Sequence, residues 1–178
     1  MGKFSQFKLP LRSLAEGTHT FEYHLDKQFF ENMESVDVRD ADINVALTVT
    51  YQHDVYALSF VLKGTVTVPC DRCLDDLPLD IDTVYNINVR YGEDYNDSDD
   101  FMEIPESDAF LNVAYMIYDT VSLAIPIKHV HPLGKCNRAM SSLLKKHRAH
   151  APGDDDAELE DELIDEIDTM PEDQSSDE

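Results

Sequence analysis

The chain has 178 residues, 42% of them hydrophobic, which is enough to bury one core. Its formal net charge of -23 argues against binding to DNA or RNA over the whole surface, because negative side chains repel phosphates. It has three cysteines and no apolar run long enough to cross a bilayer. We therefore expect a cytoplasmic protein in a reducing compartment, with neither a membrane partner nor a DNA partner.

The charges fall into three blocks. Residues 1–119 carry 23 acidic and 8 basic side chains, residues 120–153 carry 6 basic and no acidic ones, and residues 154–178 carry 14 acidic and no basic ones. We predict a folded domain over 1–150 and an acidic, flexible tail over 151–178 that is disordered in isolation and competes in cis for the basic block. The basic block either contacts RNA or a protein, or balances the acidic parts of the chain. The predicted contacts are Arg72, Lys128, Lys135, Arg138, Lys145, Lys146 and Arg148.

The first half of the chain has the pattern of strands around one short helix. The helix is predicted over residues 26–33, with Asp26 as its N-cap and Phe29, Phe30 and Met33 facing inward. Gln52 to Asp54 and Lys63-Gly64 interrupt the alternation of apolar and polar side chains, the first as a hairpin turn and the second as a turn or bulge. Strands of an antiparallel meander are predicted at 18–25, 43–50, 55–62, 65–68 and 79–91.

One long helix is predicted over residues 107–125, opened by Ser107 and ended by Pro126. Its aromatic residues and methionine, Tyr115, Met116 and Tyr118, are interpreted as core. A short basic helix is predicted over 138–150 after Asn137. The fold class is therefore α+β: a mainly antiparallel, twisted sheet that curls toward a barrel, covered by the long helix, with short helices and the acidic tail.

The residues that carry candidate chemistry are cysteines and histidines. Cys70 and Cys73 form a Cys-x-x-Cys turn, which the strand pattern places at the tip of a hairpin. With Cys136 and His131, or with His129 in place of His131, they match a tetrahedral structural zinc site of three thiolates and one imidazole. The residues alone leave open whether zinc binds or whether these are ordinary reduced cysteines. A redox role is disfavoured, because Asp71, Asp75 and Asp76 outweigh Arg72 and do not stabilise a thiolate.

Enzymatic motifs are missing from the sequence. It contains no phosphate-binding glycine loop, no Gly-x-Ser-x-Gly and no His-Glu-x-x-His. His129 and His131 are spaced so that an extended segment directs both imidazoles to one side, which leaves a metal hydrolase as a weaker alternative. We expect a protein that is not an enzyme.

The segment Val-Pro-Cys70-Asp-Arg72-Cys73-Leu is followed by an acidic linker and a helix that runs into Asp119-Thr-Val-Ser-Leu-Ala-Ile-Pro126-Ile, with His131 and Cys136 behind it. In this order, over residues 1–140, these landmarks resemble the YceD family of bacterial and plastid proteins. Members are associated with accumulation of large-subunit ribosomal RNA, and their genes often neighbour one for a large-subunit ribosomal protein.

The resemblance implies a non-enzymatic factor for accumulation of large-subunit ribosomal RNA or assembly of the large subunit. Its implied partners are a large-subunit rRNA precursor or a large-subunit ribosomal protein. Many members carry further cysteines after the one that matches Cys136, whereas Asn137-Arg138-Ala139-Met140 has none. A site of four thiolates within this chain is therefore impossible. A small zinc-binding regulatory module unrelated to ribosomes is the alternative function.

Overall fold

The computed structural model describes residues 3–98, 101–132 and 134–147. The chain divides into two compact units. Unit 1 consists of the chain up to Val68 together with Pro78–Ile127, and unit 2 consists of Pro69–Leu77 together with the chain from Lys128 onward. Each unit thus combines segments that are far apart in the sequence. The predicted domain boundary at residue 150 lies outside the described residues.

Unit 1 is built on a six-stranded sheet in the order β2-β3-β4-β5-β7-β6. The pairs β2–β3 and β3–β4 are antiparallel, whereas β5 and β7 are parallel. A second sheet joins β1 to β8. The strands are β1 (Lys8–Leu9), β2 (Gly17–Asp26), β3 (Asp40–Gln52), β4 (Val55–Pro69), β5 (Asp76–Gly92), β6 (Asn96–Asp97), β7 (Phe101–Pro105) and β8 (Leu111–Asn112). The predicted α+β class with a mainly antiparallel sheet is confirmed.

The sheet does not close into the predicted barrel. Its edge strands in the described part of the chain are β2 and β6, and these do not pair with each other.

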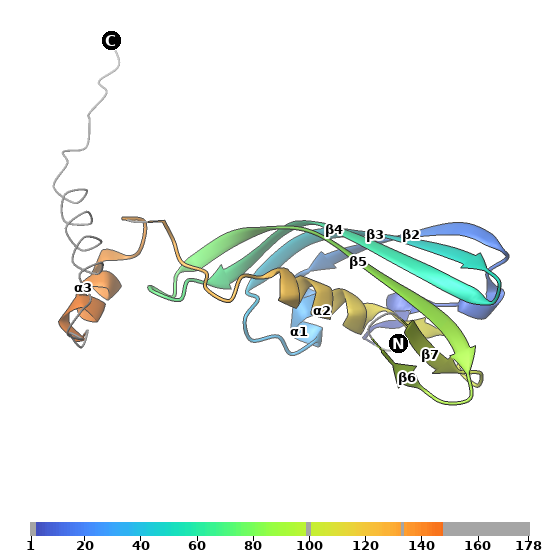
Figure 1. The fold of residues 1–178 in the computed structure, drawn as a ribbon. Coiled ribbons are helices and arrows are strands. Elements are labelled where there is room, and N and C mark those ends of the chain that lie inside the picture. Colours follow the sequence, from blue (N-terminus) through green and yellow to red (C-terminus); the bar gives the residue numbers. More distant parts are fainter. Residues whose placement is uncertain (1–2, 99–100, 133, 148–178) are drawn as a thin grey trace, which may run out of the picture. The chain divides into compact units, whose positions relative to one another are not determined.

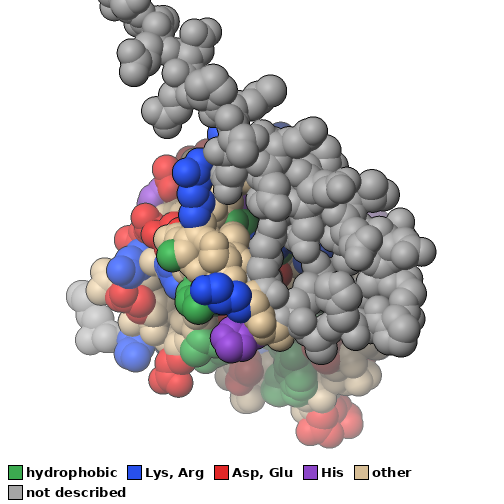
Figure 2. All heavy atoms as spheres, turned by 90° about the vertical axis from the view of Figure 1, so that its left-hand side faces the viewer, with side chains coloured by type: hydrophobic (Ala, Val, Ile, Leu, Met, Phe, Trp, Pro, Cys, Tyr) green, Lys and Arg blue, Asp and Glu red, His purple; other side chains and the backbone are tan. Residues whose placement is uncertain are grey.

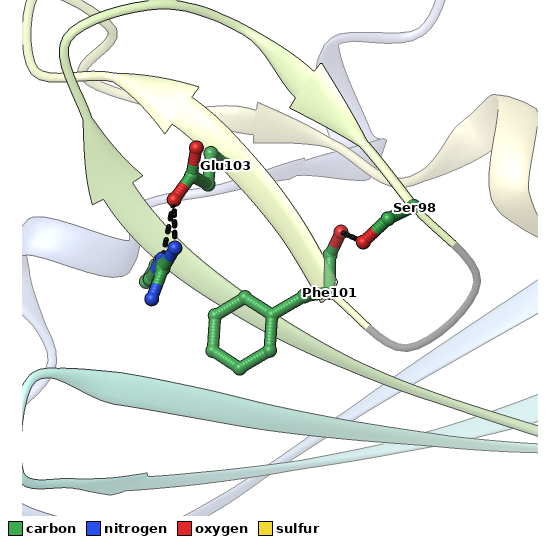
Figure 3. Close-up of polar contacts among 4 residues, drawn as sticks. Ser98, Phe101 and Glu103 are labelled. Carbon is green, nitrogen blue, oxygen red and sulfur yellow. Dashed lines mark hydrogen bonds and ion pairs between the residues drawn. The ribbon is translucent and has the colours of Figure 1, made fainter.

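The strand β7 is held parallel to β5 by side chains as well as by backbone pairing (Figure 3). Arg90 Nε donates to Glu103 Oε1 at 2.6 Å, and the Arg90 guanidinium lies 4.6 Å from the ring centre of Phe101. Ser98 Oγ donates to the Phe101 carbonyl oxygen at 2.8 Å.

Two helices, α1 (Lys27–Asn32) and α2 (Ala114–Ala124), lie on the same face of the sheet (Figure 1). The alternation along β3 and β4 directs side chains such as Leu47, Leu58 and Phe60 into the buried core. Aromatic rings link the elements around this core, with Phe29 5.0 Å from Phe7 between ring centres. The apolar burial of the meander, rather than any single contact, therefore holds unit 1 together.

The first short helix agrees with its prediction. Asp26 Oδ1 accepts a hydrogen bond from the Phe29 N–H at 3.1 Å, as an N-cap does. Phe29 and Phe30 are buried, whereas Met33 is only half-buried and follows the helix. The cap and the two phenylalanines are thus confirmed as the features that define α1.

Of the two predicted breaks in the meander, only the first ends a strand. His53 and Asp54 form the turn between β3 and β4, with φ of 51° and 60°. By contrast, β4 continues through Lys63-Gly64. A Cβ at Gly64 would lie 2.6 Å from the Ile43 Cα and would collide with a second backbone atom of β3. This glycine therefore permits a close approach between two strands rather than a turn.

The long helix is shorter than predicted. It begins at Ala114 instead of Ser107, because residues 111–112 pair with β1 as β8. Asn112 Oδ1 then accepts from the Ala114 N–H at 3.1 Å and begins the helix. Phe110, predicted on the helix, lies before it and is 54% exposed. The end before Pro126 is confirmed, since α2 ends at Ala124.

In unit 2 the third helix, α3 (Arg138–His147), follows Asn137. Asn137 Oδ1 accepts from the Ala139 N–H at 3.0 Å, which agrees with a capping role. Leu143 and Leu144 are half exposed on this helix. The predicted acidic tail, 151–178, lies outside the described residues. No helix in the described ranges combines the length and the apolarity needed to span a membrane.

Candidate metal centre

The Cys-x-x-Cys turn lies between two neighbouring strands of the sheet order, β4 and β5, at the predicted hairpin tip. Two backbone hydrogen bonds close it: the Leu74 N–H donates to the Cys70 carbonyl oxygen and the Cys70 N–H to the Asp75 carbonyl oxygen, both at 2.9 Å. Leu74 has a φ of 64°, a left-handed conformation that a leucine adopts only where its surroundings fix it. The turn therefore holds both thiols on one side.

The segment after residue 128 returns to this turn. The Asp71 N–H donates to the His129 carbonyl oxygen at 3.0 Å, and the His129 N–H donates to Asp71 Oδ2 at 2.7 Å. His131 follows two residues later, and its N–H lies 3.4 Å from Cys70 Sγ. This backbone pairing brings the second pair of predicted ligands, from far along the chain, to the first.

Four side chains meet at this point: Cys70, Cys73, His131 and Cys136. One ligand atom from each lies within 4.8 Å of all the others. Cys70 Sγ and Cys136 Sγ are 3.9 Å apart, and Cys73 Sγ and His131 Nδ1 are 3.4 Å apart. For Zn²⁺ with Zn–S and Zn–N bonds of about 2.3 and 2.05 Å, a tetrahedron has edges of about 3.8 Å between sulfurs and about 3.6 Å between sulfur and nitrogen. The Cys70–Cys136 and Cys73–His131 distances fit such a site.

The thiols are free rather than oxidised. All three cysteines are unpaired, and 3.9 Å between two sulfurs is far longer than a disulfide bond of about 2.05 Å. Cys70 and Cys73 are 0% and 3% exposed, so the first two donors are shielded from water and oxidants. Thiolates are soft donors, so buried, convergent thiols bind zinc in preference to harder cations.

The two nitrogens of His131 have different partners. Nδ1 faces the cluster, whereas Nε2 lies 3.2 Å from the Asp76 carbonyl oxygen. A carbonyl oxygen only accepts, so Nε2 carries a proton, and Nδ1 is the nitrogen that would offer its lone pair to a bound metal. Metal-ligating histidines commonly donate their second N–H to a carbonyl in this way, which fixes the tautomer and the ring orientation.

His129, the predicted substitute for His131, faces elsewhere. Its Nε2 lies 3.3 Å from Asp71 Oδ1, as an ion pair when the imidazole is protonated. The two imidazoles therefore do not share a centre. A hydrolase built on both histidines would also need an open coordination position, whereas three thiolates and one imidazole fill a tetrahedron.

The electrostatics of the cluster favour one thiolate before any metal binds. The expectation that no thiolate is stabilised at the Cys turn is wrong, because it considered only charged side chains and the stabilisation comes from backbone N–H groups. Burial would raise the pKa of Cys70, but hydrogen bonds from the backbone N–H groups of Cys73 and His131 outweigh it and lower this pKa to about 6. Burial and the neighbouring thiols Cys73 and Cys70 raise the pKa of Cys136 to about 11. Hydrogen bonding to Cys70 raises the pKa of His131. A bound cation would displace the remaining protons and relieve the crowding of like charges.

The predicted contact residues in the described part of the chain belong to unit 2. Lys128, Lys135 and Lys146 have exposed side chains, and Arg72 is half-buried in the Cys turn. Arg138 is exposed at the start of α3, and Lys145 lies within this helix. Arg148 lies outside the described residues. Figure 2 shows Lys and Arg side chains (blue) on the face that it draws, with Asp and Glu side chains (red) on the same face.

Sequence reasoning missed Asp71 as a structural residue. Its carboxylate binds the His129 backbone and lies beside the His129 ring, and so ties the returning segment to the turn. The two residues are 58 positions apart, and no local pattern signals such a pair. The Asp76 carbonyl group that orients His131 was missed for a similar reason, because backbone acceptors have no sequence signature.

The comparisons with known proteins bear on this centre. A protein-family model described as "Large ribosomal RNA subunit accumulation protein YceD" matches residues 58–166. The chain belongs to the YceD family. The match covers the Cys turn, α2, the returning segment and α3, and therefore contains all four members of the cluster. The YceD match begins later and ends later than the resemblance over residues 1–140 suggested. No curated protein and no solved structure matches this chain.

Proposed function

We propose that this protein is a non-enzymatic factor that supports accumulation of large-subunit ribosomal RNA during assembly of the large subunit. It acts in the cytoplasm, where reduced thiolates persist, and contacts precursor rRNA or a large-subunit ribosomal protein. The observation that carries the proposal is the YceD family match over residues 58–166. The exposed lysines of unit 2 support a phosphate contact, since they are the cations of the only basic block in the sequence.

We further propose that zinc occupies the cluster of Cys70, Cys73, His131 and Cys136 and has a structural role. Its support is the fit of the distances to a tetrahedron and the orientation of His131. Four protein donors leave no position for a substrate or a reactive water, so the site stabilises unit 2 and performs no chemistry. This geometry also supports the proposal that the protein is not an enzyme.

The test is depletion of the protein followed by measurement of the ratio of large-subunit to small-subunit rRNA. We expect the ratio to fall, and to be restored by the wild-type chain and by the control variant His53→Asn, whose exposed histidine lies in the β3–β4 turn. Cys136→Ser should restore it only in part. An unchanged ratio on depletion would refute the proposal.

The specific geometry of the cluster also keeps a second candidate function open: a zinc-binding regulatory module unrelated to ribosomes. It makes a different prediction for the same depletion. The purified protein would contain one zinc ion per chain, yet the rRNA ratio would not respond to its loss.

A further inference from the structure

Unit 1 contains a groove of about 690 Å³ between α2 and the strands β5 and β6. One wall is a row of α2 residues at helical spacing, Tyr115, Asp119 and Leu123, which lie on a different side of the helix from the buried Ile117 and Val121. The opposite wall includes Val84 of β5 and the segment Tyr95 to Asp97. The prediction that Tyr115 belongs to the core is wrong, because its side chain is 59% exposed.

Apolar side chains predominate in the lining of the groove, which is open at its rim. Met102, Leu111 and Thr120 form a buried floor. Leu123 is 86% exposed at the rim, and Val84 and Tyr95 are also more than half exposed. Large apolar side chains gathered around one concavity, rather than scattered singly, are typical of a binding surface.

Two carboxylates lie in this otherwise apolar groove. Asp119 is exposed in the α2 row, and Asp97 is exposed on β6, where its Oδ2 lies 3.5 Å from the Tyr95 hydroxyl. Burial raises the pKa of Tyr85, and Asp97 and Asp119 raise it further, so both carboxylates act on the same ring. A cationic side chain between them would be attracted by both.

This combination of apolar floor and acidic rim limits the occupant. The carboxylates repel RNA phosphates, and they repel the tail over residues 154–178, which has 14 acids and no base. A second copy of a chain with net charge -23 is disfavoured for the same reason. A small molecule is disfavoured because the polar groups stand at the exposed rim and do not converge in an enclosed pocket.

We propose that this groove binds a segment of a basic protein that combines leucine or aromatic side chains with lysine or arginine. The apolar side chains rest on Leu123, Tyr115 and the buried floor, and one cation lies between Asp97 and Asp119. The proposal deepens the proposed function, on which it rests only for the source of the partner, a large-subunit ribosomal protein.

The test uses the full chain and an array of overlapping peptides that covers the large-subunit ribosomal proteins of the host. We expect the binding peptides to carry both apolar and basic side chains, and their affinity to fall as salt increases. We expect the dissociation constant for these peptides to rise at least about tenfold in the double variant Asp97→Asn with Asp119→Asn, and separately in Leu123→Ala. All three side chains are exposed, so the fold should be retained.

Matched controls lie outside the groove in unit 1. Asp37→Asn with Asp80→Asn removes the same charge, and Val36→Ala trims an apolar side chain that is 88% exposed. Both should bind the peptides like the wild type. Equal binding by groove and control variants would overturn the proposal. The proposal would also be overturned if the groove variants alone lost binding to a single-stranded RNA, or if they alone lost the ability to form a dimer of the chain.

The outcome is separable from that of the proposed function. Peptide binding is measured on purified protein, whereas the proposed function is tested by the rRNA ratio after depletion. A normal ratio together with groove-dependent binding of ribosomal peptides would refute the role in rRNA accumulation and leave the groove site standing. A fallen ratio with no groove-dependent binding would refute only the groove site.

Discussion

Replacement of Cys136 by serine should loosen unit 2 and leave unit 1 folded. The substitution removes one of four donors and leaves Cys70, Cys73 and His131. Loss of a mere supporting contact around a metal ligand lowers affinity about 10- to 100-fold, so we expect loss of a ligand to cost at least about a hundredfold, or about 2.7 kcal/mol.

The structure indicates how much order remains without the metal. In the described part of unit 2, the returning segment is held to the turn by the Asp71–His129 backbone bond, by the Asp71 carboxylate and by the contacts of His131. Such bonds contribute about 1 kcal/mol each, or about 2 kcal/mol when charged. A structural zinc site contributes about 10 kcal/mol or more in small zinc domains. Metal should therefore dominate the stability of unit 2.

The assay is hydrogen exchange on the zinc-loaded protein, with zinc content measured in parallel. In Cys136→Ser, and in wild type treated with a chelator, amides of residues 70–75 and 129–131 should exchange faster while those of β3 and β4 do not change. His131→Asn should behave alike, and His53→Asn should match the wild type. Equal protection of the Cys turn in the metal-free and the zinc-loaded protein would refute a stabilising role for the metal.

Three further predictions concern pH, packing and the tail. Zinc affinity should rise by at least about tenfold per pH unit between pH 7 and 9, because Cys136, with a pKa of about 11, must lose a proton when zinc binds. Below pH 6 the affinity should fall more steeply, because Cys70 also becomes protonated. A competition titration that shows no dependence on pH would contradict this. Gly64→Ala should lower the free energy of unfolding, measured by urea denaturation, by about 1–3 kcal/mol. Gly92→Ala should have little effect, because its added Cβ makes only an ordinary van der Waals contact. Equal urea midpoints of unfolding for the two variants would refute the close approach of the strands at Gly64. Truncation after Gly153 should strengthen RNA binding at low salt if the tail masks the basic block, and unchanged binding would reject autoinhibition.

The three thiols of the candidate metal centre were predictable because thiolate ligation of zinc depends on residue type and spacing more than on the surrounding fold. Two thiols at Cys-x-x-Cys spacing can bind one metal ion together, Cys136 is the one remaining cysteine of the sequence, and His131 and His129 are the histidines nearest to it. The choice between His129 and His131 was not predictable. It depends on the pairing of His129 with Asp71 across 58 positions and on a backbone carbonyl group at Asp76.

The start of α2 and the groove show a second limit of sequence reasoning. Residues 107–113 have helical spacing, but Leu111 and Asn112 pair with Leu9 and Lys8 near the start of the chain. Periodicity is a local signal and does not register such a pairing. In the same way, apolar residues on two sides of α2 predict burial, and only the tertiary structure shows that the side carrying Leu123 remains exposed.

The two proposed contacts make opposite demands on charge and can be separated by salt dependence. If Lys128 and Lys135 neutralise phosphates, replacing both by glutamine should lower the slope of log affinity for RNA against log salt by about 1.5, since each single-strand contact contributes about 0.7 and each duplex contact about 0.9. Asp119→Asn in the groove removes a repulsive charge, so it should not lower that slope, yet it should weaken binding of basic peptides. The alternative outcome is that the lysine variant and the groove variant each weaken both RNA binding and peptide binding. In that case the assignment of separate sites for RNA and for basic peptides would be wrong.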